Sequence, residues 1–266
     1  MRILFLGDVV GRTARQQVIA GLAGLRDELA VDFIIVNVEN SAGGFGVTPT
    51  IADEFLAAGA DVLTTGNHVW DKREIFAYID NEPRLLRPYN MIENTPGKGL
   101  VVVENTKGQR LAVANMMTNL FMAENENAFS CLETLLSDVK LGRDADALVI
   151  DIHGEATSEK TAFGFAADGR ATLVVGTHTH IPTADHRILP GGTAYQTDAG
   201  MCGDYTSVIG MNKEAALGRF TGVDGGRLEV AKGVATLCGI IVESDDETGL
   251  ARSITPFRRD GVLEAC

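Results

Sequence analysis

Five short apolar runs, each followed by side chains that bind metals, recur along the chain and predict strands of a sheet. Short runs rich in Val, Ile, Leu and Phe are typical of buried strands. The runs and the polar residues that follow them are 3–6 with Asp8, 33–38 with Glu39 and Asn40, 62–65 with Asn67 and His68, 148–152 with His153, and 173–175 with His178 and His180. Open α/β sheets bind ligands at the carboxyl ends of their strands, so the pattern predicts one pocket at a sheet edge.

Helical patterns alternate with these runs. Apolar residues at helical spacing predict a helix over 13–29, and Thr48 before Pro49 predicts a capped helix that ends near Ala58. The other predicted elements are helices over 71–79, 128–139 and 157–166, and strands over 100–104, 110–116, 193–197 and 233–243. This alternation predicts an α/β fold, and the further strands that join without intervening helices predict mixed rather than purely parallel sheets.

Length and composition favour one cytoplasmic domain. At 266 residues and 45% hydrophobic content, the chain can bury a full core, and no linker-like stretch divides it. We therefore expect a single domain over 1–266, with a small cap-like segment around 200–220. The longest apolar segments are strand-sized, and residues 1–10 lack the pattern of a signal peptide, which predicts no membrane association. The four cysteines are far apart, which disfavours both a disulfide framework and a zinc knuckle.

The net charge of −13 restricts the partners of the protein. Proteins that hold long nucleic acids by the backbone normally display a basic face, so polymeric DNA or RNA is disfavoured. A small phosphate ester remains compatible with this charge, because bound divalent cations reverse the local potential of a pocket.

The residues at the run ends form one set of oxygen and nitrogen ligands. The set contains no thiolate, which suits manganese, iron or zinc better than copper(I), calcium or magnesium. Its seven members are Asp8, Glu39, Asn40, Asn67, His153, His178 and His180. Seven ligands are too many for one tetrahedral ion, whereas two ions that share a bridging carboxylate would use them all. This count predicts a dinuclear centre, and the position of four of the five histidines at run ends supports its place at the sheet edge.

The order of these residues resembles the motifs of the calcineurin-like metallophosphoesterases. The matching positions are Gly7-Asp8, Glu39-Asn40, Gly66-Asn67-His68, His153 and Gly176-Thr177-His178-Thr179-His180. Longer stretches resemble the YmdB-like branch of these enzymes, namely 6–11, 38–46, 65–72, 153–160 and 198–201. Two departures from the broad superfamily, Val10 in place of a metal-binding histidine and Glu39 in place of aspartate, are shared by this branch. Gly154 departs from the branch, which is expected to have alanine there.

The resemblance implies a fold, ligand roles and an activity. The fold would be a four-layer αββα sandwich of mixed sheets flanked by helices. Glu39 would bridge two ions, Asp8 and His180 would complete one site with Asn40 in place of the missing histidine, and Asn67, His153 and His178 would complete the other. A hydroxide held between the ions would attack phosphorus while His68, as general acid, protonates the leaving oxygen. The implied substrates are 2′,3′-cyclic nucleotides, and a homo-oligomer would be unsurprising.

Three alternatives remain open from the residues alone. A (β/α)₈ metal hydrolase also lines the mouth of its barrel with ligands from strand ends. Hydrolases of the amidohydrolase type resemble one another in placing His-x-His on the first strand, whereas in this chain it comes late, at 178–180. A phosphomonoesterase would use the same ligands. A non-catalytic metal-binding regulatory protein needs no proton donor, so His68 discriminates it from an enzyme. The physiological substrate and the metal identity are not determined by these residues.

Overall fold

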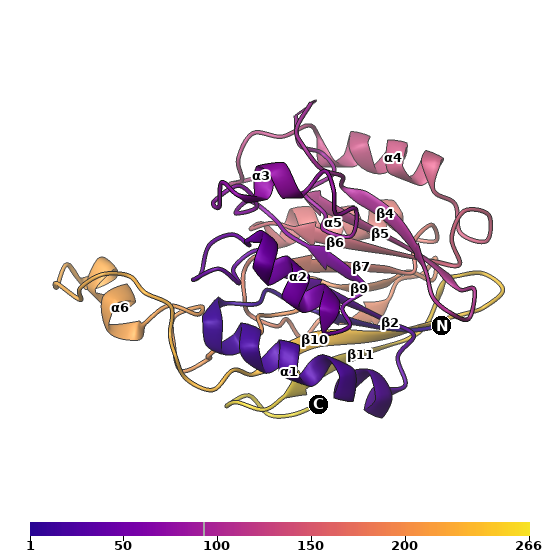
Figure 1. Ribbon diagram of the computed structural model, residues 1–266. Helices are drawn as coiled ribbons and strands as arrows, with labels where there is room; N and C mark the ends of the chain where they lie inside the picture. Colours follow the sequence, from indigo (N-terminus) through magenta and orange to yellow (C-terminus); the bar gives the residue numbers. More distant parts are fainter. Residues whose placement is uncertain (93) are drawn as a thin grey trace.

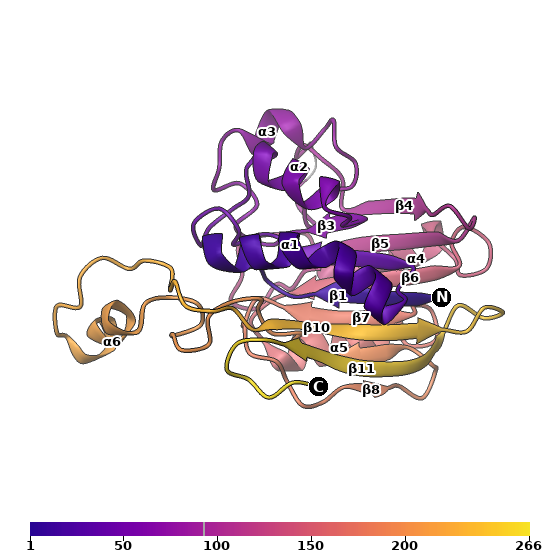
Figure 2. The same cartoon turned by 60° about the horizontal axis from the view of Figure 1, so that its bottom comes forward.

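Two mixed sheets lie face to face, with helices on their outer faces (Figures 1 and 2). This computed structural model describes residues 1–92 and 94–266. The strands are β1 (Arg2–Leu6), β2 (Phe33–Asn37), β3 (Val62–Thr64), β4 (Leu100–Glu104), β5 (Arg110–Met117), β6 (Ala147–His153), β7 (Leu173–Thr177), β8 (Arg187–Ile188), β9 (Ala194–Gln196), β10 (Leu237–Ser244) and β11 (Ala251–Arg259). The helices are α1 (Gly11–Leu29), α2 (Pro49–Ala57), α3 (Ile75–Tyr78), α4 (Ala128–Asp138), α5 (Thr157–Ala167) and α6 (Lys213–Thr221).

Strand direction brings the polar strand ends together. The first sheet has the order β11-β10-β1-β2-β3, in which β1, β2 and β3 run parallel. The second has the order β4-β5-β6-β7-β9-β8, in which β5, β6, β7 and β9 run parallel. Antiparallel strands close the remaining positions, β10 and β11 in one sheet and β4 and β8 in the other. Each sheet therefore presents several carboxyl ends at a single edge.

Three apolar layers hold these elements together. Phe5 and Phe33 of the first sheet pack with Val149 of the second, which forms the layer between the sheets. Leu22 of α1 belongs to the layer on the outer face of the first sheet, and Phe163 of α5 belongs to the layer on the outer face of the second. This order of layers confirms the predicted αββα sandwich with mixed sheets.

Most predicted elements are present, with two corrections. The helix predicted over 71–79 is only the four residues of α3, because the amides of Ile75 and Phe76 bond three residues back, to Lys72 and Arg73, and form turns. The strand predicted over 233–243 begins at 237, because Thr236 pairs with Gly203 instead of a neighbouring strand. The cap of α2 is as predicted: the side chain of Thr48 accepts a hydrogen bond from the Ile51 amide, and Pro49 is the first residue of the helix. All four cysteines are free.

The segment that follows residue 203 extends away from the two sheets and carries α6 at its far end (Figures 1 and 2). It overlaps the predicted cap-like segment. At the base of this segment, an isolated β-bridge between Met211 and Val230 joins its outgoing and returning parts. Within the described residues, no helix combines the length and the apolar character needed to cross a membrane.

Candidate metal centre

All seven predicted ligands lie at the shared edge of the two sheets. Asp8 follows β1, Glu39 and Asn40 follow β2, and Asn67 follows β3. His153 is the last residue of β6, and His178 and His180 follow β7. The first sheet thus contributes the carboxylates and amides, and the second contributes the imidazoles. The two ligand types meet across the interface of the sandwich.

The Nε2 atom of His153 is the centre of one group. It lies 2.9 Å from Oδ1 of Asn67, 3.2 Å from Oε1 of Glu39 and 3.1 Å from Nδ1 of His178. Candidate ligand atoms of Glu39, His153 and His178 all fall within 4.8 Å of one another. An atom pair such as two imidazole nitrogens at this distance needs either a shared proton or a cation between them.

Hydrogen bonds on the far side of the His153 ring decide which nitrogen faces this group. Thr177 Oγ1 donates to Oδ1 of Asp151 at 2.6 Å, so it accepts from Nδ1–H of His153 at 2.9 Å. Neutral His153 therefore presents an Nε2 lone pair to the carboxylate of Glu39 and the amide oxygen of Asn67. A position surrounded only by acceptors fits a metal ion, and a hydrogen-bonded ligand histidine is the usual support for one.

A second group of acceptors lies beside the first. Nε2 of His180 is 3.3 Å from Oδ1 of Asn40, and Oδ2 of Asp8 accepts from the amide of His178 at 3.2 Å. In the part of the chain that the structure describes, the other carboxylate oxygen of Asp8 is buried without a hydrogen-bond partner. A buried acceptor without a donor is costly, and a bound cation would satisfy it.

The pKa values of these groups reflect burial and close opposite charges. Burial alone would raise the pKa of Glu39, but the adjacent His153 holds it at about 2. Burial would lower the pKa of His153, but Glu39 raises it to about 9. Burial raises the pKa of Asp8 to about 7, and burial next to His153 lowers that of His178 to about 3. Without metal, a proton on His153 therefore occupies the place where a divalent cation fits.

Gly66 leaves room for such a cation. A Cβ atom at this position would lie 2.3 Å from Nε2 of His153 and 2.4 Å from Oε2 of Glu39. Both atoms belong to residues of the acceptor group described above. The absence of a side chain at Gly66 therefore keeps open the space between these acceptor atoms.

His68 lies at the rim of the same group and is held by a carboxylate. Its Nδ1 is 2.8 Å from Oδ2 of Asp71, and its backbone amide donates to Oε2 of Glu39 at 3.3 Å. The ring of Phe45 packs edge-on against it at 5.0 Å between centroids. Because the carboxylate of Asp71 accepts the hydrogen bond from Nδ1–H, Nε2 is the atom of His68 that is available for proton transfer.

Comparisons with known proteins agree with this geometry. A family model described as YmdB-like protein matches residues 4–257. The chain belongs to the YmdB-like family. It is 45% identical to a 2′,3′-cyclic-nucleotide 2′-phosphodiesterase of Bacillus subtilis, covering 96% of this chain and 95% of that protein. It is 37% identical to a putative phosphatase/phosphodiesterase of Mycoplasma pneumoniae, covering 93% and 89% of the two chains.

Solved structures place the YmdB-like chain in the same fold. A hypothetical protein from Thermus thermophilus matches with a TM-score of 0.89 at 37% identity, covering 97% of this chain and 99% of that one. A structure described as a novel phosphatase, from Mycoplasma pneumoniae, matches with a TM-score of 0.88 at 36% identity, covering 97% and 93%. The family and the metallophosphoesterase fold inferred from the motifs are therefore confirmed.

A recess of about 360 Å³ gives access to the candidate ligand groups of this family member. Apolar walls come from Phe45 and from Ile209 and Met211 at the base of the α6 segment. Glu155 adds a carboxylate, and its Oε2 lies 3.2 Å from Nε2 of His178. A substrate in this recess would lie beside both the ligands and His68.

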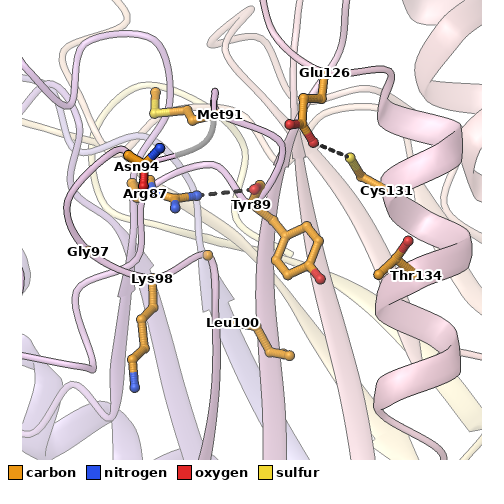
Figure 3. Close-up of a pocket in the computed structure, with 11 residues that line it drawn as sticks. Arg87, Tyr89, Met91, Asn94, Gly97, Lys98, Leu100, Glu126, Cys131 and Thr134 are labelled. Carbon is orange, nitrogen blue, oxygen red and sulfur yellow. Dashed lines mark hydrogen bonds between the residues drawn. The ribbon is translucent and has the colours of Figure 1, made fainter.

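A larger cavity, about 490 Å³, lies beside α4 and contains none of the seven ligands among its described lining residues (Figure 3). Two of its polar side chains bond to other lining residues. Arg87 donates to the backbone oxygen of Tyr89, and Cys131 donates its thiol hydrogen to Glu126 (Figure 3). Arg87 also donates to the backbone oxygen of Pro88. Burial, together with that carboxylate, raises the pKa of Cys131 to about 11, so this thiol is a poor nucleophile.

Several supporting residues were not predicted from the sequence. Asp71 could have been found, because it follows His68 by three residues within one turn. Asp151 lies inside an apolar run and gives no separate signal, and Thr177 at the end of β7 is not a residue type that marks a metal site. Gly154 also has a local explanation, because a Cβ there would lie 1.9 Å from Oγ1 of Thr118, where the expected alanine would not fit.

Proposed function

We propose that this protein is a metal-dependent phosphodiesterase that hydrolyses 2′,3′-cyclic nucleotides. The observation that carries the proposal is the acceptor-only group around Nε2 of His153, with His68 and its Asp71 partner at the rim of the same recess. The likeness to the Bacillus subtilis enzyme supports the substrate. We infer that two divalent ions occupy the site, with iron or manganese favoured over zinc by the mixed oxygen and nitrogen ligands.

We assign the seven ligands to two overlapping groups. Glu39 directs one oxygen toward His153 and the other toward Gly66 and the His68 amide, which suits a bridging carboxylate. Asp8, Asn40 and His180 would hold one ion, and Asn67, His153 and His178 the other. When bound, divalent ions supply Lewis-acid activation of water and of phosphoryl oxygens. Their charge exceeds that of the two carboxylates by two, which attracts an anionic ester.

We assign the proton transfer to His68. The carboxylate of Asp71 accepts Nδ1–H and stabilises the imidazolium, so Nε2–H can be delivered to the oxygen that leaves phosphorus. Losing a general acid typically lowers the rate by a factor of about 10² to 10⁴. This role separates an enzyme from a metal-binding regulatory protein, which would need no donor at this position.

Glu155 favours a diester over a monoester. Its carboxylate lies in the recess, next to His178. A fixed negative charge repels a dianionic phosphomonoester more than a monoanionic phosphodiester, because the repulsion scales with substrate charge. The recess size falls within the range of small-molecule sites, which suits a mononucleotide and not a duplex.

Hydrolysis of 2′,3′-cyclic AMP by the protein loaded with Mn²⁺ tests the proposal. Chromatography of the products is expected to show adenosine 3′-phosphate, since opening the 2′ ester bond leaves phosphate on the 3′ oxygen. A sample treated with chelator and His68→Ala should both lose turnover. His186→Ala is the matched control, because His186 lies outside the ligand groups. Full turnover by His68→Ala would reject the proton-donor role, and absence of turnover in the loaded wild type would reject the substrate.

A further inference from the structure

The loop that carries two of the proposed ligands has an unusual backbone. His178 has a φ of 94° and His180 a φ of 66°, both in the left-handed region that residues with a side chain rarely adopt. Two such residues in one short loop store strain. Strain of this kind persists only where the surrounding structure determines the conformation, and it concentrates at functional sites.

A fully buried ion pair lies against this loop. Nζ of Lys160, on α5, is 3.0 Å from Oδ2 of Asp198, and neither side chain is exposed to solvent. Nζ also donates to the backbone oxygen of Thr177 at 3.1 Å, at the start of the loop. The cation therefore ties α5 to the residue directly before His178.

Asp198 holds the middle of the same loop. Its Oδ2 accepts from the amide of Thr179 at 3.1 Å and from the Thr179 hydroxyl at 2.7 Å. Its Oδ1 accepts from the amide of Gly200 at 2.9 Å. Thr179 stands between the two histidines, so the carboxylate fixes the peptide that sets their separation.

Stability alone does not account for this pair. Burying two charges costs desolvation that their attraction seldom exceeds, and apolar residues of similar size often stabilise a core better. The packing is also close, because a Cβ on Gly176 would lie 1.8 Å from the backbone oxygen of Thr197 and 2.9 Å from Cδ of Lys160. The hydrogen bonds of the pair converge on one loop, which indicates a role in its geometry.

We propose that Lys160 and Asp198 are positioning residues that hold His178 and His180 in the strained conformation required to bind two metal ions at once. The pair acts through the backbone of Thr177 and Thr179 and touches neither ion. This inference rests on the proposed metal site but not on the identity of the substrate. It predicts that loosening the loop weakens metal binding more than it weakens the fold.

The test compares Mn²⁺ binding and thermal unfolding in four proteins. Lys160→Met with Asp198→Asn removes both charges together, so no unpaired charge is left in the core. Thr179→Val removes one hydrogen bond to Asp198 without introducing a charge. Tyr195→Phe is the control, because the buried Tyr195 hydroxyl bonds to Thr161 and Thr197 and not to the loop.

Calorimetry should show Mn²⁺ affinity at least tenfold lower in the double variant and about threefold lower in Thr179→Val, with the control unchanged. Electron paramagnetic resonance at two equivalents of Mn²⁺ should change from a coupled pair of ions to isolated ions in the double variant. Wild-type affinity in a folded double variant would overturn the inference, and if that variant fails to fold, unchanged affinity in Thr179→Val would overturn it. A wild type that binds no metal would instead reject the proposed function.

Discussion

Gly66→Ala should strongly weaken metal binding through one added methyl group. The φ of Gly66 lies outside the left-handed region, so the backbone itself permits alanine. The new Cβ would nevertheless lie 2.3 Å from Nε2 of His153 and 2.4 Å from Oε2 of Glu39. Ordinary carbon contacts are about 3.5 Å or longer, so each ligand atom would have to move by about 1 Å.

A displacement of this size exceeds what a metal site accepts. Ligand distances in metal sites hold within about 0.2 Å, and changes to residues that merely support a ligand cost about 10- to 100-fold in affinity. We therefore expect the Mn²⁺ dissociation constant of Gly66→Ala to rise by about 100-fold or more. Crowding of the core should destabilise the metal-free protein by only about 1–3 kcal/mol.

Isothermal titration calorimetry with Mn²⁺, together with thermal unfolding of the metal-free protein, separates the two effects. Gly24→Ala is the matched control, because Gly24 lies in α1 with open space around its Cβ position. That change should leave metal affinity as it is and stabilise the helix by about 1 kcal/mol. Wild-type affinity for Mn²⁺ in Gly66→Ala would refute the placement of an ion between Glu39 and His153.

Three further predictions concern proton transfer, selectivity and charge. Asp71→Asn should lower kcat by about 10- to 100-fold with metal content unchanged, because the imidazolium of His68 loses its carboxylate partner; loss of metal instead would contradict this. Glu155→Gln should raise the ratio of kcat/KM for p-nitrophenyl phosphate to that for 2′,3′-cyclic AMP, and an unchanged ratio would remove Glu155 from substrate selection. Mn²⁺ binding at pH 7 should release between one and two protons, since the pKa of Asp8 is about 7 and that of His153 about 9 and both groups bind metal deprotonated. For the same reason the affinity for Mn²⁺ should rise from pH 7 to 9, and calorimetry in buffers of different ionisation enthalpy can measure the proton release.

The candidate ligands at strand ends were predictable from the sequence, and the residues that support them were not. The proposed ligand set follows from local pattern, because a polar side chain after an apolar run marks the carboxyl end of a strand. Asp151 is invisible to that rule because it sits inside a buried strand, and Thr177 because a threonine at a strand end is not one of the metal-binding residue types that the pattern selects. Their hydrogen bonds join β6 to β7 and β6 to the opposite sheet, where Asp151 also accepts from Asn37 and Thr64.

Contacts between distant segments account for the remaining differences. β11 was not predicted, and its burial pattern has few fully buried positions to mark it. Lys160 could be placed near the site because it is close to His153 along the chain. Its partner Asp198 is distant in the sequence and follows β9, so only the fold brings the two together. α6 was expected only as part of a cap-like segment, because its sequence has a weak amphipathic pattern. In the structure this helix lies away from the two sheets (Figure 1). Whether it serves as a cap stays a prediction.

The most direct test of a catalytic dinuclear centre is the rate of 2′,3′-cyclic AMP hydrolysis during titration of metal-free protein with Mn²⁺. The proposed centre predicts a rate that increases until two equivalents are bound per chain, and a His68→Ala protein that binds both equivalents with little turnover. Activity that is complete at one equivalent, or independent of metal, would contradict the two-ion assignment. No hydrolysis at saturating Mn²⁺ would contradict the proposed activity itself.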